Sequence, residues 1–166
     1  MTIYGMRQPL SACHESFTER WYKAVNNQSL KVYLFYCSSS FDMIEPVFCG
    51  EREGELKAIP LPCSGKIDIL YLTKAFETGA DGVAVVTCPQ GECRYLEGNL
   101  RARKRAEAVD ALLEEIGLGK GRIAIIQMKG EGIEPVIRQI DDFCARIKAL
   151  PGRVPDASVQ VPAPRY

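Results

Sequence analysis

The chain has 166 residues, of which 46% are hydrophobic and 25% charged, and its 21 basic and 21 acidic residues balance to a formal net charge of zero. These proportions are typical of one soluble globular domain, and the charge balance argues against a broad surface for nucleic acid or anionic membranes. No apolar stretch approaches the roughly 20 residues that span a bilayer, and residues 1–10 lack the apolar core of a signal peptide, so we expect a cytoplasmic protein without a membrane span.

The N-terminal part of the chain predicts a leader followed by a first strand. Residues 1–29 are mixed and polar, with apolar side chains at a spacing that allows one short amphipathic helix. Residues 30–36 are dense in β-branched and aromatic side chains, which favours a strand. The segment Phe41–Cys49 is apolar at helical spacing, but Pro46 shortens or distorts any helix there.

The next segment predicts a strand and a helix. Residues 55–61 have the composition of a second strand, and Pro60 together with Pro62 favours a place at the edge of a sheet. A helix is expected over about 67–78, with Gly79 where a C-terminal cap belongs.

The remainder of the chain repeats this alternation. Residues 82–87 are continuously apolar, which indicates a strand buried on both faces, as in a parallel sheet. A long helix is expected over 99–116, a fourth strand over 122–128 and a closing amphipathic helix over 134–149. Residues 151–166 are rich in proline and predict an extended tail.

Together these elements predict a single α/β domain over residues 30–150, with the leader 1–29 before it and the tail 151–166 after it. Four β–α units imply a flavodoxin-like parallel sheet of about four strands with helices on both faces. Neither a G-x-G-x-x-G nor a P-loop fingerprint is present, so no nucleotide site is expected.

Seven cysteines and one histidine, His14, restrict the kinds of site that the chain can form. Intracellular proteins use cysteines mainly for metals or redox work, and an odd number fits a complete disulfide set poorly. With one histidine, neither a Ser-His-Asp triad nor a multi-histidine zinc site is expected. Cys49 and Cys144 are interpreted as small apolar residues outside any site.

Four other cysteines follow the ends of predicted strands. Cys37 follows the first strand, Cys63 the second, and Cys88 and Cys93 the third. Ligands bind at the carboxyl ends of the strands in open parallel sheets, and thiolates are favoured at helix N-termini. We therefore predict one metal or redox site from these four thiols, with iron–sulfur chemistry as the first candidate. Convergence of the loops depends on the strand order, which the sequence leaves open.

Two alternatives remain open from the residues alone. Cys88 and Cys93 would suit a dithiol protein that cycles through a disulfide. An adaptor subunit would hold zinc or no metal, although the C-x-x-C spacing of zinc ribbons is missing here. The basic run 101–105 is interpreted as a solvated helix face, with contact to an acidic partner as the alternative.

The segment Cys88–Asn99 is the most specific motif of the chain, and shorter motifs accompany it at Tyr36-Cys37, Cys63–Asp68, Lys74–Val83 and Lys104-Arg105. Over roughly residues 31 to 149 the chain resembles the delta subunit family of methyl-viologen-reducing hydrogenase. Members of this family are small iron–sulfur proteins that pass electrons to heterodisulfide-reductase-type flavoproteins. Ser40 stands where family members commonly carry a second cysteine, three residues after the first.

The resemblance implies an electron-transfer subunit without catalysis of its own. Its single [2Fe–2S] cluster would be held by Cys37, Cys63, Cys88 and Cys93. The implied partners are a flavin- and iron–sulfur-containing protein similar to heterodisulfide reductase A and a hydrogenase or other reductase module, including one of a benzoyl-CoA-reductase-type complex. Arg94 and Lys66 are candidate cations for tuning the potential of the cluster.

Overall fold

A computed structural model of the chain describes residues 29–39, 55–128 and 132–150, which are arranged around a parallel β-sheet. Its strands are β1 (Lys31–Cys37), β2 (Glu55–Leu61), β3 (Gly82–Thr87) and β4 (Ile123–Gln127). Its helices are the 3-10 turn η1 (Ser64–Lys66), α3 (Ile69–Glu77), α4 (Gly98–Glu115) and α5 (Glu134–Ala149). The strand order is β2-β1-β3-β4, and every neighbouring pair is parallel.

This architecture confirms the predicted fold class, and all four strands begin and end within one residue of the expected positions. Among the described strands, β2 pairs with β1 alone and lies at an edge, as the prolines at its end predicted. The helix expected from residue 67 begins two residues later, because residues 64–66 form a separate turn. The Asp68 carboxylate then caps α3 by accepting the Ile69 N–H at 2.6 Å.

Three expectations lie outside the described residues: the leader helix, the distorted helix at Phe41–Cys49 and the extended tail 151–166. In the part of the chain that the structure describes, no helix combines the length and the apolar character needed to cross a membrane.

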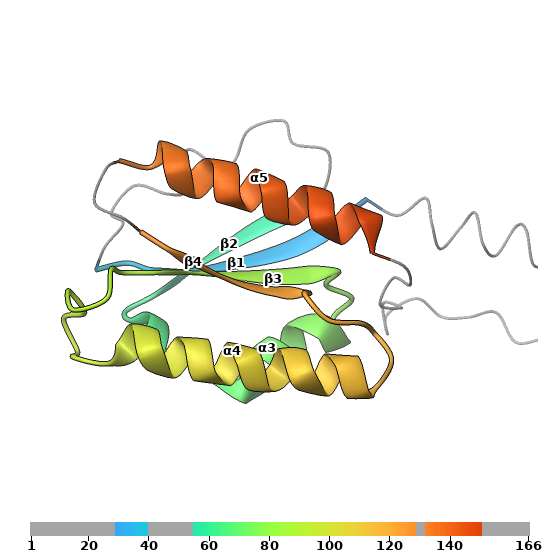
Figure 1. Ribbon diagram of the computed structural model, residues 1–166, viewed down its shortest axis with the longest axis horizontal. Helices are drawn as coiled ribbons and strands as arrows, with labels where there is room; N and C mark the ends of the chain where they lie inside the picture. Colours follow the sequence, from blue (N-terminus) through green and yellow to red (C-terminus); the bar gives the residue numbers. More distant parts are fainter. Residues whose placement is uncertain (1–28, 40–54, 129–131, 151–166) are drawn as a thin grey trace, which may run out of the picture.

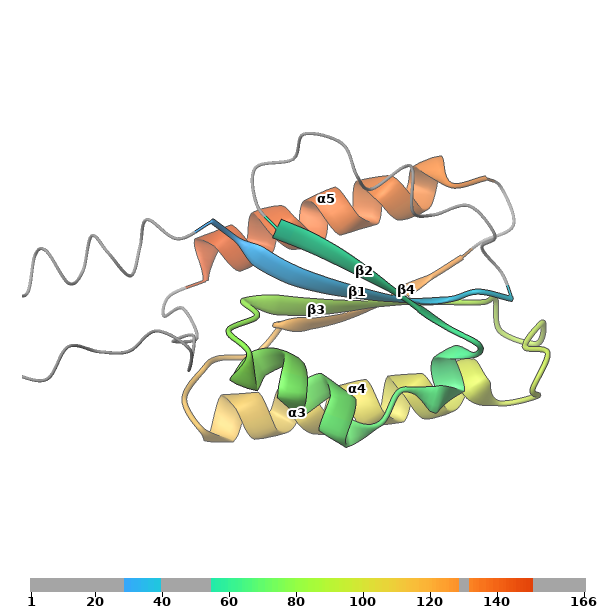
Figure 2. The ribbon, with the colours of Figure 1, turned by 180° about the vertical axis from the view of Figure 1, so that it is seen from behind.

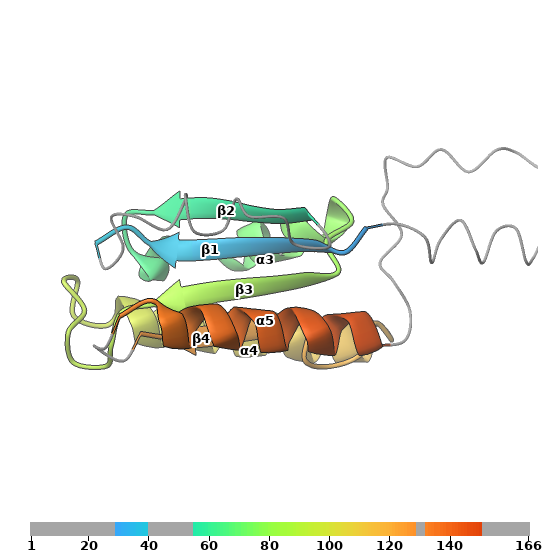
Figure 3. The same cartoon turned by 90° about the horizontal axis from the view of Figure 1, so that it is seen from above.

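Helices cover both faces of the sheet. Figures 1 and 3 show α5 on one face and α3 with α4 on the other. Successive strand residues point to opposite faces, so Leu34 packs in the core under α5 while Phe35 packs in the core under α3 and α4. Every residue of β3 is buried, which explains why its sequence is apolar without alternation.

The strand order brings the carboxyl ends of β1, β2 and β3 together, because β1 lies between the other two. The chain runs outward from β1 to β2 and then returns past β1 to β3, so a topological switch point lies between β1 and β3. Figure 2 shows β2 leading into η1 beside the N-terminal end of α4. The loops that carry the four predicted cysteines therefore meet at one edge of the sheet.

Candidate metal centre

Four thiols line one small cavity at this edge. The cavity has a volume of about 90 Å³, and its cysteines are Cys37, Cys63, Cys88 and Cys93. All four residues are buried, with at most 8% of their surface exposed. The structure thus brings together the four cysteines that the sequence singled out. Among the described cysteines none forms a disulfide.

Each thiol is positioned by the end of a strand or the start of a helix. Cys37 is the last residue of β1, and Cys88 directly follows β3. Cys63 has extended backbone at the N-terminus of η1, where its sulfur accepts the Gly65 N–H at 3.4 Å. The cavity is therefore anchored to the rigid sheet on one side and to helix termini on the other.

The sulfur of Cys93 takes the place of an N-terminal cap for α4. The residue before this helix, Glu97, makes no capping hydrogen bond with its side chain. The N–H groups of Tyr95, Gly98 and Asn99 instead donate to the Cys93 sulfur. Because N–H groups at the start of a helix have no partner within it, they are available to stabilise negative charge on a ligand.

Asn99 fixes the opposite end of the cysteine loop. Its side-chain N–H group donates to the carbonyls of Cys88 at 3.3 Å and Pro89 at 2.8 Å. Its side-chain oxygen accepts the Leu100 N–H at 2.8 Å, within the first turn of α4. Asn99 thereby ties the residues after β3 to the helix that follows and holds Cys88 and Cys93 on the same cavity.

The thiols differ in their tendency to ionise. Burial, reinforced by the neighbouring thiols, raises the pKa of Cys88 to about 12. Burial also raises the pKa of Cys63, although the Gly65 N–H partly offsets this effect. Burial opposes ionisation of Cys93 as well, but the three N–H groups and the thiol of Cys88 outweigh it and lower the pKa of Cys93 below its ordinary value.

Two glycines allow η1 and α4 to approach closely around Cys63. A methyl group on Gly65 would lie 2.7 Å from the Cα of Gly98, and one on Gly98 would collide with the Cys63 sulfur. Arg105 of α4 fastens the same turn, because its guanidinium donates to the carbonyls of Gly65 at 2.9 Å and Ile67 at 2.6 Å. The sequence motifs contained these residues, but nothing in their spacing predicted the contacts.

The cations predicted near the site occupy different places. Arg94 lines the thiol cavity, as expected, whereas Lys66 lies in a neighbouring groove. Within the basic run, Arg103 and Lys104 are exposed as predicted. Arg105 departs from the expected solvated face, because it is half-buried and holds the turn that carries Cys63. Cys144, on α5, packs against the core and does not line the cavity.

Four cysteine thiols are a ligand set that iron–sulfur clusters use in proteins. Among the described residues, no three His, Cys, Asp or Glu side chains form a group suited to one ion. A cluster with four cysteine ligands distributes them over more than one iron, so its ligands need not surround a common point. The hydroxyl of Ser64, next to Cys63, is fully buried and has no hydrogen-bond partner. Buried hydroxyl groups in proteins normally donate to an acceptor, so a group bound beside Ser64 would supply one.

Comparisons with known proteins identify relatives of the chain. The sequence model of the family described as methyl-viologen-reducing hydrogenase, delta subunit, matches residues 50–151. The iron-sulfur subunit of the F420-non-reducing hydrogenase vhu of Methanocaldococcus jannaschii is 38% identical over 95 residues, which are 57% of this chain and 71% of that protein. The iron-sulfur subunit of the F420-non-reducing hydrogenase of Archaeoglobus profundus is 34% identical over 96 residues, 57% of this chain and 69% of that protein.

A longer protein contains a similar segment. One polypeptide of the ferredoxin:CoB-CoM heterodisulfide reductase of Methanosarcina mazei is 30% identical over 95 residues, which are 57% of this chain and 12% of that protein. The family match includes Cys63, Cys88 and Cys93, whereas Cys37 precedes it. The family match therefore covers the loops that follow β2 and β3. Cys37, at the end of β1, is associated with the site by its place on the cavity.

Proposed function

Because the chain belongs to the methyl-viologen-reducing hydrogenase delta subunit family, we propose that it is an iron–sulfur electron-transfer subunit of a hydrogenase- or heterodisulfide-reductase-type complex. The observation that carries the proposal is the set of four buried thiols on one cavity at the sheet edge. The names of the relatives support iron–sulfur chemistry and this kind of complex.

The proposed cofactor is one [2Fe–2S] cluster, and its ligands are the four cavity cysteines, Cys37, Cys63, Cys88 and Cys93. When bound, such a cluster accepts and releases one electron at a time. The subunit would then act as a relay between the redox centres of its partners.

The residues around the cavity affect how readily the thiols ionise, and ionised thiols are the ligands that a cluster needs. Ligation requires thiolates, so loading releases protons, and Cys93 ionises more readily than Cys63 or Cys88. Cys63 and Cys88 have raised pKa values and lose their protons at a greater cost, which a bound cation offsets. The N–H groups at the start of α4 and the guanidinium of Arg94 favour added negative charge.

The proposed partners are a flavoprotein similar to heterodisulfide reductase A and a hydrogenase or other reductase module, such as that of a benzoyl-CoA-reductase-type complex. The heterodisulfide reductase polypeptide of Methanosarcina mazei carries a segment similar to this chain within its greater length. A domain that occurs both as a separate protein and inside a heterodisulfide reductase polypeptide is well suited to exchange electrons with such a partner.

Anaerobic purification of the full chain with its complex tests the proposal. We expect two irons per chain and an electron paramagnetic resonance signal after reduction, and fewer than two irons would reject the [2Fe–2S] assignment. Cys93→Ala should lose or destabilise the cluster, whereas Cys144→Ala, outside the cavity, should retain it. Equal iron retention in both variants would reject the proposed ligands.

One observation favours a second function, a dithiol that cycles through a disulfide. The Cys88 thiol hydrogen-bonds the Cys93 sulfur, and a low-pKa cysteine beside a second thiol is typical of such proteins. This hypothesis predicts that the anaerobically purified chain holds no iron and that mild oxidation joins Cys88 to Cys93. Peptide mapping by mass spectrometry under both conditions decides between the two functions.

A further inference from the structure

A second, larger depression shares a wall with the thiol cavity. It is a groove of about 440 Å³ along the start of α4, and we refer to it as the α4 groove. Cys63 and Tyr95 line both the thiol cavity and the α4 groove. A molecule seated in this groove would therefore lie against Cys63, and Cys63 and Tyr95 would separate it from the other three thiols.

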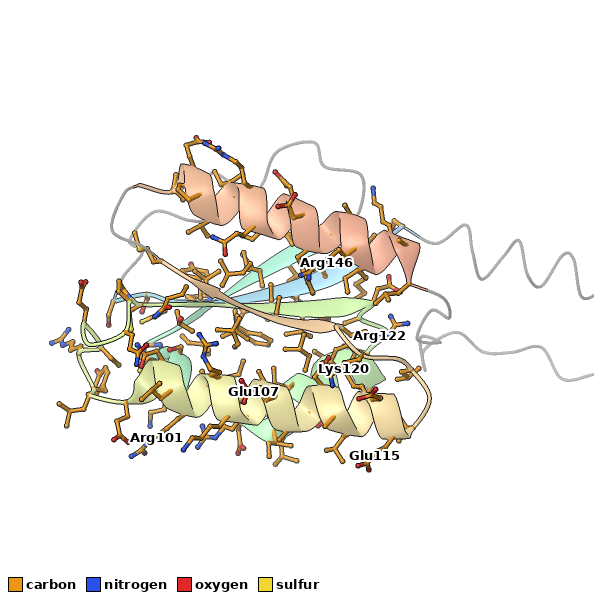
Figure 4. All side chains as sticks on the ribbon, viewed as in Figure 1. Arg101, Glu107, Glu115, Lys120, Arg122 and Arg146 are labelled. Atoms are coloured by element: carbon orange, nitrogen blue, oxygen red, sulfur yellow. The ribbon has the colours of Figure 1, made fainter. Side chains whose placement is uncertain are left out.

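The α4 groove is positively charged within a chain whose net charge is zero. It contains Lys66, Arg101 and Arg105, and Asp68 as its carboxylate. That carboxylate already accepts the N–H group at the start of α3. Arg101 lies 3.8 Å from the exposed carboxylate of Glu97, the residue before α4, and such a pairing contributes little in water. Figure 4 shows Arg101 projecting from the start of α4.

The lip of the groove is apolar and exposed. Tyr95 has 57% of its surface exposed, and Leu96, the next residue, has 86% exposed. Leu96 also has a φ of 67°, a left-handed backbone conformation that leucine rarely adopts. An exposed apolar pair held in a strained loop, with cations beside it, is typical of a protein contact surface.

The occupied helix terminus argues against a small anion as the natural ligand. Phosphates bind helix N-termini through unpaired N–H groups. At α4, the N–H groups of Gly98 and Asn99 already donate to the Cys93 sulfur, and that of Leu100 donates to the Asn99 side chain. The charge of the groove therefore comes from side chains, the fixed Arg105 and the more exposed Lys66 and Arg101, and such cations suit carboxylates on a protein surface.

We propose that the α4 groove receives an acidic segment of the flavoprotein partner, whose apolar flank rests on Tyr95 and Leu96. This inference rests on the proposed function and adds the route of the electron. The partner's redox centre exchanges electrons with the thiol site through the wall formed by Cys63 and Tyr95.

Charge reversal within the groove provides the test. The iron-loaded full chain carrying Lys66→Glu and Arg101→Glu is mixed anaerobically with the reduced flavoprotein that co-purifies with the wild type. We expect the second-order rate of cluster reduction to fall by about tenfold or more, with a weaker dependence on salt. The matched control carries Arg103→Glu and Lys104→Glu, two exposed cations on α4 that do not line the groove, and should react within about twofold of the wild type.

The readouts separate this inference from the proposed function. Dithionite, which needs no docking, should reduce all variants alike, and absence of iron from the wild type would contradict the proposed function. Equal rates with the flavoprotein for groove and control variants would overturn the groove as its docking site. Carbodiimide cross-linking with mass spectrometry should join Lys66 to an aspartate or glutamate of the flavoprotein. A groove that binds pyrophosphate while the variants keep the flavoprotein rate would also overturn the proposal.

Discussion

At the scale of single residues, the four thiols of the site are not equivalent. The Cys93 sulfur accepts hydrogen bonds from backbone N–H groups at the start of α4, and these bonds lower its pKa. Burial instead raises the pKa values of Cys63 and Cys88. The difference follows from position, since Cys93 sits where a helix terminus favours negative charge and Cys88 directly follows a fully buried strand. In the proposed iron–sulfur site, Cys93 would therefore form a thiolate for a bond to iron more readily than Cys63 or Cys88.

This difference predicts an order of modification in the iron-free chain. Only the thiolate reacts with iodoacetamide, so Cys93 should be alkylated about tenfold or more faster than Cys88 between pH 7 and 9. Raising the pH towards 12 should speed the modification of Cys88, because its pKa lies at about 12. Timed alkylation followed by peptide mass spectrometry measures both rates. Equal rates at pH 8 would contradict the proposed asymmetry.

At the scale of elements, the site depends on how closely η1 and α4 pack. Continuous apolar runs and helical periodicity were sufficient to predict the strands and helices that the structure describes, and the positions of the cysteines at strand ends predicted which four gather on one cavity. Convergence of those ends was not predictable, because strand order results from packing across the whole sheet. The contacts of Gly98 and Arg105 escaped prediction for a similar reason, since they join segments about 40 residues apart.

Substitution of one glycine tests this packing. In Gly98→Ala the added methyl group meets the Cys63 sulfur, so η1 and α4 must separate. We expect loss of iron and a free energy of unfolding lower by about 1–3 kcal/mol. Glu97→Ala is the matched control, because Glu97 precedes α4, is exposed and makes no capping bond, and it should retain its iron. Iron analysis and urea unfolding of the iron-free chain provide the measurements; iron retention by Gly98→Ala would contradict the role of close packing.

At the scale of the whole molecule, the two ends of the sheet have separate tasks. The thiol cavity lies at the carboxyl ends of the strands, whereas Arg122 lies just before β4, at the other end. Figure 4 shows Arg101 and Arg122 at opposite ends of α4. The buried Arg122 donates to the carbonyls of Leu118 at 2.6 Å and Asp81 at 3.0 Å, which joins two loops at that end. Stability and redox chemistry are thereby supported by different residues.

Replacement of this arginine should affect stability alone. Arg122→Met removes the donor from the buried carbonyl of Asp81 and the partly buried carbonyl of Leu118, and we expect the free energy of unfolding to fall by about 3 kcal/mol. The reduction potential of the loaded chain should stay unchanged, because Arg122 lies at the end opposite the thiols. Lys120→Met removes an exposed ion pair of 3.4 Å and should cost at most about 0.5 kcal/mol. Denaturant unfolding and redox titration test the separation, and a shift in potential would contradict it.

The start of α4 has a consequence for the biosynthesis of the protein. Three of the cavity thiols precede residue 90 in the chain. The backbone N–H groups that donate hydrogen bonds to the Cys93 sulfur come later, and the last of them belongs to Asn99. A nascent chain that has emerged from the ribosome only as far as Cys88 holds three of the four proposed ligands but lacks both Cys93 and the helix terminus that positions it. With the proposed cluster at this site, iron delivery to the chain would be productive only after α4 has been synthesised and has docked on the sheet.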